Sequence, residues 1–168
     1  MAALTSAGIL LYRLGAEAGC EVLLGHMGGP FWARKDDGAW SIPKGEHGPE
    51  EEPFDVARRE FEEELGSPVP ATEFLPLGQS RVTSGKLLTV WAAAGEFDAA
   101  SSRSNTFTIE WPPRSGRLQE FPEIDRSAWF PVGAARVKLV KGQVPFLDRL
   151  LERLPGDDAP AGTPSPGR

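Results

Sequence analysis

The stretch GEHGPEEEPFDVARREFEEELGS, residues 45–67, places nine carboxylates and two arginines within 23 residues. Neighbouring carboxylates repel one another and raise each other's pKa, so such crowding does not stabilise a fold by itself. Pro53 suits the first turn of a helix, and Gly66 suits the position just past a helix end. The stretch therefore predicts an acidic helix between these two residues. That helix is either a solvated charged face or a site that holds cations.

Helical periodicity divides the side chains of this segment into faces. An apolar stripe for the core is formed by Phe54, Ala57, Phe61 and Leu65. At about 100° per residue, Glu60, Glu63 and Glu64 gather on a neighbouring face, whereas Glu62 points elsewhere. Three carboxylates at this spacing destabilise a helix unless a cation binds, and Mg²⁺ or Mn²⁺ takes such hard oxygen ligands.

Three nearby residues are predicted to support this cluster. Arg59 is expected on another side of the helix, where it does not simply neutralise the cluster. From there it can reach back to Glu51 and hold the loop before the helix. Gly45 allows that loop to approach closely and to offer its carbonyl oxygen to a metal ion.

These positions resemble the signature of the Nudix hydrolase family, G-x5-E-x7-R-E-U-x-E-E-x-G-U, in which U is an apolar residue. The residues in register are Gly45, Glu51, Arg59, Glu60, Phe61, Glu63, Glu64 and Gly66. Ser67 departs from the final apolar position, although Val69 lies close by. The resemblance covers roughly residues 5–154 and implies an α/β fold in which a mixed β-sheet is sandwiched between helices (α/β/α).

The resemblance also implies a reaction. Nudix enzymes hydrolyse a nucleoside diphosphate linked to another group, with Mg²⁺ as cofactor and Mn²⁺ as a substitute. By this resemblance Glu60, Glu63 and Glu64 bind the metal with help from the Gly45 carbonyl, and the bound ion lowers the pKa of the attacking water. Glu51 and Arg59 would hold these ligands in place.

The general base stays open between the glutamates of the signature, Glu63 and Glu64, and a carboxylate from a distant loop. Glu120 and Glu123, in LQEFPEIDRSAWF, are the candidates in such a loop. Glu123 is favoured because its position resembles that of the extra metal ligand in diadenosine tetraphosphate hydrolases. An exposed loop charge is an equally good interpretation of Glu123.

Residues that contact the substrate are predicted in three places. Lys44 directly precedes the signature and can contact a phosphate, and Lys86 precedes a strand in KLLTVWAAAGEF. A solubilising charge at a strand edge explains Lys86 equally well. Trp32 and Arg34 lie in the Gly-rich loop 26–38, where Trp32 either stacks on a base or anchors the loop.

Two further pairs of residues are expected in or beside loops. Arg114 and Arg117, in WPPRSGR, are plausible contacts for a long polyphosphate. His26 and His47 flank loops and are expected to have surface roles.

The preferred substrate is a nucleoside polyphosphate, with a dinucleoside polyphosphate such as diadenosine tetraphosphate as one possibility. The alternatives are a nucleoside triphosphate, a diphosphoinositol polyphosphate, and a non-catalytic domain that senses a nucleotide. Degenerate sensors usually lose the acidic residues of the signature, which are all present here. The net charge of −6 argues against a protein that coats nucleic acid.

The rest of the chain predicts a single domain over residues 1–154 and a disordered tail rich in Pro, Gly and Asp over 155–168. Strands are expected at 6–13, 20–26, 39–45, 73–82, 86–97, 107–111 and 128–132, and further helices at 133–140 and 144–154. The first two strands should form a hairpin. A single cysteine, no signal peptide and no membrane-spanning run favour a cytoplasmic protein. A homodimer is common in the family.

Overall fold

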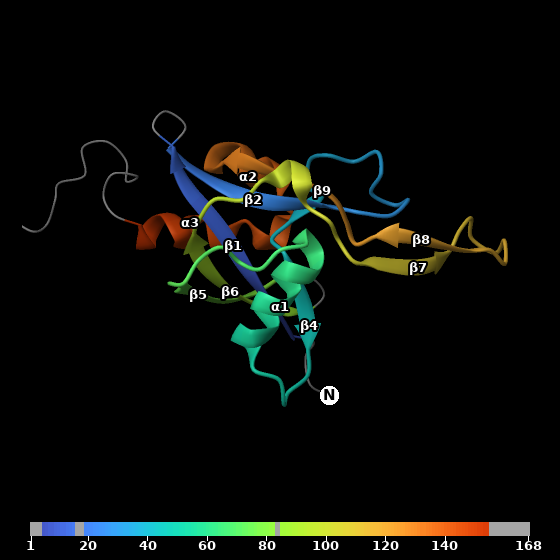
Figure 1. The fold of residues 1–168 in the computed structure, drawn as a ribbon, viewed down its shortest axis with the longest axis horizontal. Coiled ribbons are helices and arrows are strands. Elements are labelled where there is room, and N and C mark those ends of the chain that lie inside the picture. The colour runs from blue at the N-terminus through green and yellow to red at the C-terminus, as the bar shows by residue number, and fades with distance from the viewer. Residues whose placement is uncertain (1–4, 16–18, 83–84, 155–168) are drawn as a thin grey trace, which may run out of the picture.

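A mixed β-sheet of seven strands forms the centre of the computed structural model, which describes residues 5–15, 19–82 and 85–154 (Figure 1). Its strands are β1 (Thr5–Gly15), β2 (Gly19–Met27), β3 (Trp40–Ser41), β4 (Lys44–His47), β5 (Leu75–Arg81), β6 (Leu87–Ala94) and β9 (Ile124–Pro131). β1 lies in the middle, antiparallel to β2 and β4 and parallel to β6. The hairpin predicted for the first two strands is confirmed. The predicted tail, 155–168, lies outside the described residues.

The segment 39–45 departs from its prediction as one strand that ends at Gly45. It divides into β3, which pairs with β2, and β4, which continues to His47 along β1. Pro43 separates the two, because it has no N–H to donate to a ladder. Its carbonyl oxygen instead accepts a hydrogen bond of 3.2 Å from the amide of Ile9. This break turns the chain so that Lys44 and Gly45 run beside the acidic helix.

Helices cover both faces of the sheet, as the α/β/α prediction requires. Leu10 and Tyr12 of β1 face α2 (Val132–Lys138) and α3 (Pro145–Arg153), while Ile9 and Leu11 face α1 (Pro53–Leu65). Two short 3-10 turns complete this part of the chain: η1 (Ala99–Ser101) follows β6, and η2 (Lys141–Gln143) lies between α2 and α3. Within the described ranges, no helix is both long and apolar enough to cross a membrane.

The acidic helix α1 has the boundaries that its sequence predicts. Pro53 is its first residue, and Gly66 follows it with a φ of 90°, a left-handed conformation that favours glycine. The Gly66 amide donates a hydrogen bond of 2.7 Å to the carbonyl of Glu62. Val56, Ala57, Phe61 and Leu65 are buried against the sheet. The burial of this apolar face leaves Glu62 and Glu63 exposed, whereas Glu64 is buried at the edge of the face.

A hairpin of two strands projects from the body of the molecule (Figure 1). It consists of β7 (Thr106–Glu110) and β8 (Leu118–Pro122), which pair with each other in a sheet of their own. The sequence predicted β7, whereas β8 was not predicted. Phe121 of β8 pairs directly with Phe107 of β7.

The outermost strand of the described sheet, β5, contacts two arginines of α3. Arg149 donates to the carbonyl oxygens of Leu77 and Gln79 at 3.1 and 2.9 Å. Arg153 donates to the carbonyl oxygen of Pro76 at 2.6 Å. These bonds fix α3 along the edge of the sheet.

Candidate active site

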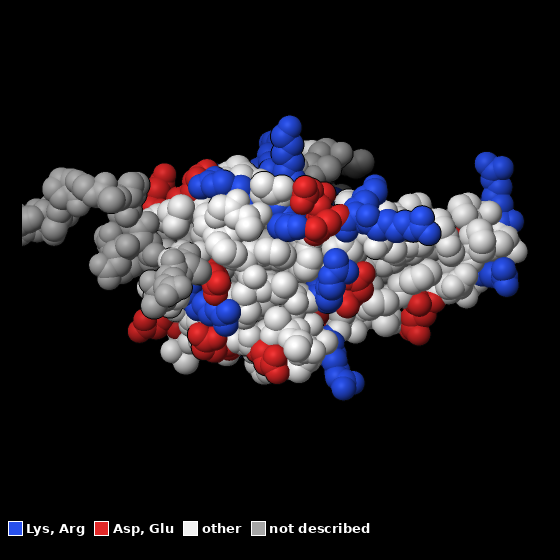
Figure 2. Space-filling view, turned by 90° about the horizontal axis from the view of Figure 1, so that it is seen from above, with Lys and Arg blue, Asp and Glu red and all other residues white. Residues whose placement is uncertain are grey.

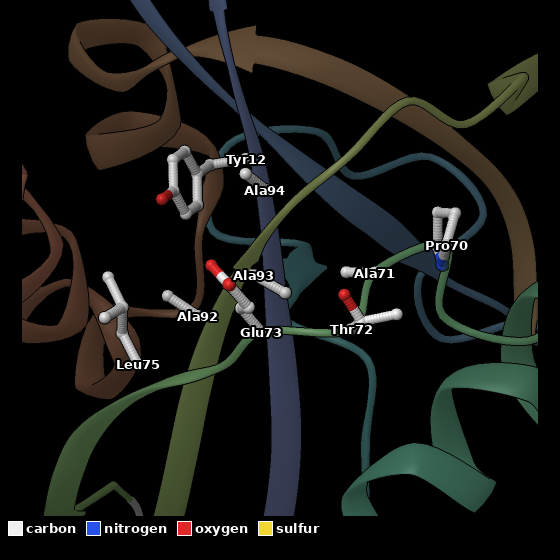
Figure 3. Close-up of a pocket in the computed structure, with 9 residues that line it drawn as sticks. All are labelled: Tyr12, Pro70, Ala71, Thr72, Glu73, Leu75, Ala92, Ala93 and Ala94. Atoms are coloured by element: carbon white, nitrogen blue, oxygen red, sulfur yellow. The ribbon is translucent and has the colours of Figure 1, made fainter.

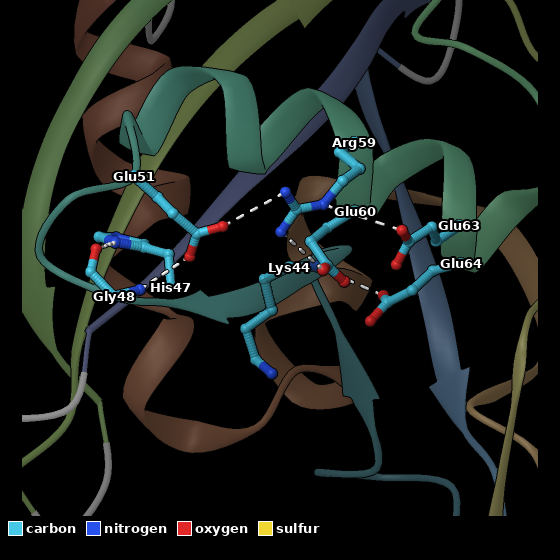
Figure 4. A network of polar contacts seen from close by, with 8 residues as sticks. All are labelled: Lys44, His47, Gly48, Glu51, Arg59, Glu60, Glu63 and Glu64. Atoms are coloured by element: carbon cyan, nitrogen blue, oxygen red, sulfur yellow. Dashed lines mark hydrogen bonds and ion pairs between the residues drawn. The ribbon is translucent and has the colours of Figure 1, made fainter.

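The acidic face of α1 borders a cavity of about 380 Å³. α1 contributes Glu60, Glu63 and Glu64 to its wall, and β4 contributes Lys44 and Gly45. Figure 4 shows that the three carboxylates project from one helix and lie near the strand that carries Lys44. The structure therefore brings together the signature residues that the sequence singled out.

Glu64 is the most deeply placed carboxylate of this group. Its residue is only 8% exposed, and its Oε1 accepts a hydrogen bond of 3.3 Å from the amide of Lys44. Burial, together with the nearby carboxylates of Glu60 and Glu123, raises the pKa of Glu64 to about 8 against the opposing effect of Lys44. Few positive charges or hydrogen bonds offset the burial of this carboxylate, so it is well suited to bind a cation.

Glu60 lies next to Gly45 and has a similar electrostatic setting. Burial raises its pKa first, and the carboxylates of Glu63 and Glu123 add to the effect, while Arg59 lowers it. A Cβ at position 45 would lie only 2.1 Å from the carboxyl carbon of Glu60. The absence of a side chain at Gly45 therefore leaves the space beside β4 that the carboxylate of Glu60 occupies.

The predicted contact between Arg59 and Glu51 is present at 3.5 Å (Figure 4). Glu51 also accepts a hydrogen bond of 2.8 Å from the amide of Gly48, and this bond is the main cause that lowers its pKa. The expectation that Arg59 leaves the cluster un-neutralised is wrong. Its guanidinium lies 3.7 Å from Glu60 and 3.8 Å from Glu63, because the side chain is long enough to reach along the helix from its own side.

The side-chain carboxylates of the described residues do not converge on one point where a metal ion could bind. Among the residues that the structure describes, no three His, Cys, Asp or Glu side chains lie in an arrangement that could hold a metal ion together. Figure 4 shows the carboxylate of Glu63 directed to Arg59. The donor set itself consists of hard oxygens, which suit Mg²⁺. Metal binding by Glu60, Glu63 and Glu64 thus needs a change of rotamer that separates Glu63 from Arg59.

Glu123 reaches the same cavity from the segment before β9. Its amide donates to the carbonyl of Asn105 at 2.8 Å, and its carbonyl accepts from the amide of Gly28 at 2.9 Å. Glu120 lies on the hairpin, where it accepts a hydrogen bond of 2.6 Å from Thr106, and it is not among the described residues that bound the cavity. Of the two loop candidates, Glu123 is thus the one near the signature carboxylates. The cavity also includes Asn105, which no local sequence pattern singles out.

Beyond Lys44 the acidic cavity continues into two further spaces. The first, of about 220 Å³, is bounded by Glu64, Glu123, Trp32 and Phe107. The second, of about 440 Å³, shares Trp32 and Lys44 with it and is mostly apolar. Trp32 thus stands between the two spaces and reaches the cleft from the loop that follows β2.

Of the other residues predicted to contact the substrate, Lys86 lies at the cleft and Arg34 does not. Lys86 borders the apolar space, but its ammonium group forms an ion pair of 2.8 Å with Glu46. Arg34 is exposed and is not among the described residues that bound any of the three connected spaces. The ammonium group of Lys35 lies 5.3 Å from the ring of Trp32. The structure therefore brings Trp32, Lys44 and Lys86 to the cleft and leaves Arg34 outside it.

The expected surface role of His26 is wrong. Its side chain is completely buried in β2, with Nδ1 2.8 Å from Oδ1 of Asp125 and Nε2 2.6 Å from the carbonyl oxygen of Lys35. The ring also contacts Trp40 edge to face, at 5.1 Å between centroids. β9 brings Asp125 beside His26, so the burial follows from a pairing that the local sequence does not reveal.

A larger cavity, of about 490 Å³, lies elsewhere in the fold (Figure 3). It is bounded by Tyr12, by the segment before β5, and by the alanines at the end of β6. Among the described residues that line it, Glu73 alone carries a charge. This cavity lacks the convergent charged groups of the cleft beside α1, which is therefore the candidate active site.

Comparisons with known proteins agree with this fold. The family model of the NUDIX domain matches residues 4–153. The chain therefore belongs to the Nudix family, whose hydrolases act on pyrophosphate bonds, and the predicted family and enzyme class are confirmed. No curated protein matches the chain significantly.

Solved structures of low sequence identity share the fold. The NUDIX domain of NrtR from Shewanella oneidensis, complexed with ADP ribose, is 17% identical with a TM-score of 0.62, and the match covers 91% of this chain and 89% of that one. The Ap4A hydrolase of C. elegans in a binary complex is 22% identical with a TM-score of 0.54, over 88% and 94% of the two chains. The ORF135 protein of E. coli is 21% identical with a TM-score of 0.55, over 97% and 96%.

Proposed function

We propose that the protein is a Mg²⁺-dependent pyrophosphohydrolase that cleaves a diphosphate linkage in a nucleoside polyphosphate. The observation that carries this proposal is the pair of desolvated carboxylates, Glu60 and Glu64, which lie opposite Lys44 at the mouth of a partly apolar cleft. Such a site offers oxygen ligands for a cation, a positive charge for phosphate and an apolar space for a base.

The residues that would hold the cation are Glu60, Glu63 and Glu64, with the carbonyl oxygen of Gly45. The donor chemistry fits Mg²⁺, with Mn²⁺ as a substitute, because all of these ligands are hard oxygens. When bound, the ion offsets charge on the diphosphate and lowers the pKa of water. Glu51 contributes indirectly, since its contact with Arg59 competes with the contacts that Arg59 makes to Glu60 and Glu63.

Within this site the chain's own residues orient the substrate and move the proton. Lys44 contacts a phosphate oxygen. Lys86 contacts another once its ion pair with Glu46 has broken. Glu123 accepts the proton of the attacking water, while the new oxygen–phosphorus bond forms and the anhydride oxygen–phosphorus bond breaks in line. Glu63 and Glu64 are the alternative bases. Trp32 stacks on the base of the nucleotide at the entrance to the apolar space.

A dinucleoside polyphosphate is the first candidate substrate. The cleft consists of three connected spaces, with Trp32 and Lys44 between the apolar end and the acidic end. A substrate that fills them has a base at one end and its phosphates near α1. A nucleoside triphosphate and a diphosphoinositol polyphosphate are the competing substrates, and a nucleotide sensor without hydrolysis is the competing function.

The test is hydrolysis of a substrate panel by the purified protein with Mg²⁺. The panel contains diadenosine tetraphosphate, ATP, ADP-ribose and a diphosphoinositol polyphosphate, and chromatography identifies the products. We expect turnover of at least one nucleotide and a loss of about 100-fold or more in Glu64→Gln. Glu62→Gln is the matched control, because Glu62 lies on the same helix but is exposed and outside the cavity.

Two results would contradict the proposal. One is a panel in which no member is hydrolysed, and binding without hydrolysis would then favour the sensor. The other is equal activity of the Glu64→Gln and Glu62→Gln variants, because the buried carboxylate would then have no part in the reaction.

A further inference from the structure

The hairpin that projects from the molecule begins at the wall of the candidate active site. We name residues 106–122 the arm. At its base, the amide of Asn105 donates to the carbonyl of Glu63 at 2.8 Å, and the carbonyl of Glu123 accepts from the amide of Gly28 at 2.9 Å. Both Glu63 and Glu123 border the acidic cavity. The base of the arm is therefore held by main-chain hydrogen bonds to two residues that border the acidic cavity.

One face of the arm packs on the loop that follows β2. The ring of Phe107 lies so close to Gly29 that a Cβ there would be 2.8 Å from it. Further along, Trp111 contacts Phe31 edge to face, with 5.2 Å between ring centroids. Phe31 is 61% exposed, so this aromatic pair lies at the surface. The arm and the loop are thus in contact at two aromatic side chains of the arm, Phe107 near the cleft and Trp111 further out.

The outer end of the arm carries two arginines, Arg114 and Arg117. Figure 2 shows basic side chains at the far end of the projecting hairpin. Neither guanidinium forms an ion pair with a residue that the structure describes. Arg117 lies beside Trp111, whose amide donates to the Arg117 carbonyl at 2.9 Å. Arg114 has a φ of 62°, a conformation that favours glycine and is unfavourable for arginine.

The length of the arm determines what these groups can reach. β7 contains five residues, which at about 3.3 Å per residue span roughly 17 Å. A mononucleotide bound at the acidic cavity does not extend to the end of that strand. An extended polyanion with an aromatic group at its far end reaches the end of the strand. Its aromatic group complements the exposed pair Phe31 and Trp111, and its negative charge complements Arg114 and Arg117.

We propose that the arm binds the distal nucleotide of an extended substrate of the dinucleoside polyphosphate class. Phe31 and Trp111 contact its base, and Arg114 and Arg117 contact its phosphates. This role rests on the proposed function, since the bond to be cleaved must lie at the acidic cavity. The arm therefore selects substrates by length.

The test measures binding by calorimetry in Ca²⁺, with ATP and with dinucleoside polyphosphates from diadenosine triphosphate to diadenosine hexaphosphate as probes. We expect the affinity of the wild type to rise with the number of phosphates. The double variant Arg114→Ala/Arg117→Ala should lose about tenfold or more in affinity for the longest probe and should keep its affinity for ATP. Phe31→Ala should reduce the same preference for length.

The matched control is Arg58→Ala/Arg136→Ala, which removes two exposed positive charges that border none of the three spaces of the cleft. It should leave the preference for length intact. The proposal is overturned if the arm variant behaves like this control, if it weakens ATP and the long probes equally, or if no probe binds to the wild type. A change of oligomeric state without a change of affinity would assign the arm to a second copy of the chain and would also overturn it.

Hydrolysis of the same probes separates this proposal from the proposed function. Binding that depends on the arm without turnover of any probe would contradict the reaction and support the arm. Turnover with the same kcat/KM in the wild type and the arm variant for every probe would support the reaction and contradict the arm.

Discussion

The imidazole of His26 joins two parts of the candidate site, because its Nδ1 lies 2.8 Å from Oδ1 of Asp125. Asp125 stands two residues after Glu123 in the chain. On its other side, Nε2 of His26 lies 2.6 Å from the carbonyl oxygen of Lys35, in the loop that carries Trp32. Both ring nitrogens face oxygen acceptors inside the protein. One buried ring therefore connects the candidate base-stacking loop with the strand that follows Glu123.

His26→Ala should lower the free energy of unfolding by about 2 to 4 kcal/mol, because it removes a buried ring and leaves its partners without a donor. Urea denaturation followed by circular dichroism measures the change. His47→Ala is the control, since His47 is only partly buried and bonds its neighbour Gly48. We expect the control to stay within about 0.5 kcal/mol of the wild type. Equal losses in both variants would refute the structural role of His26.

Glu51→Gln should raise the Mg²⁺ concentration needed for half-maximal activity by about tenfold or more. Glu51 draws the guanidinium of Arg59 toward the loop, and without that charge Arg59 pairs more fully with Glu60 and Glu63. Mg²⁺ titrations of the hydrolysis rate measure the effect. Glu52→Gln serves as the control, because Glu52 is exposed and its side chain does not cap the helix. A normal Mg²⁺ requirement in Glu51→Gln would show that Arg59 does not compete with the metal.

Gly45→Ala should reduce activity by about tenfold or more, because the new methyl group occupies the space of the Glu60 carboxylate. The control is Gly133→Ala on α2, where a Cβ meets no atom within 4 Å. Alanine should stabilise that helix by up to about 1 kcal/mol and leave the rate unchanged. Hydrolysis rates measure the predicted loss of activity, and thermal melts measure the predicted change in stability, in both variants. A fully active Gly45→Ala variant would exclude a role for the close contact between β4 and Glu60.

The raised pKa of Glu64 predicts that the metal-free protein becomes less stable as pH rises. Below the ordinary pKa of 4.5 both the folded and unfolded states carry the proton. Between there and about 8 the unfolded state loses it first, so stability falls, and above about 8 the loss is complete. The full effect of this one group is on the order of 3 to 5 kcal/mol. Urea denaturation in EDTA, from about pH 5 to about pH 8, measures it.

Glu64→Gln should remove most of this slope, because the amide does not ionise, whereas Glu62→Gln should keep it. Both variants stand on the same helix and replace a carboxyl group with an amide. If the wild type and Glu64→Gln lose stability equally with rising pH, the ionisation of Glu64 does not govern the slope.

The sequence was sufficient to predict α1 and its acidic face, because the signals for that element are local. Pro53 and Gly66 mark its ends, and the 3.6-residue period separates its carboxylates from its buried face. The approach of Glu123 to this helix was predicted only through family resemblance. Its position depends on the contacts of Asn105 with Glu63 and of Gly28 with Glu123, which join distant parts of the chain.

Other parts of the site depend on contacts that a single sequence does not display. Asp125 lies 99 residues from His26, so nothing near the histidine indicates its burial. β8 contains Gln119, Glu120 and Pro122, which have no strong preference for a strand, and it forms because β7 is available to pair with it. The reach of Arg59 to Glu60 and Glu63 depends on side-chain rotamers, which a helical wheel does not describe.

The arginines of α3 have a consequence for how copies of this chain meet. An outer strand usually presents carbonyl groups to which a strand of another molecule can hydrogen-bond. On β5 the carbonyls of Pro76, Leu77 and Gln79 already accept hydrogen bonds from Arg149 and Arg153. A neighbouring molecule would have to displace both guanidinium groups before it could add a strand there. α3 thus protects this edge from sheet extension, and with it from the first step of aggregation through edge strands.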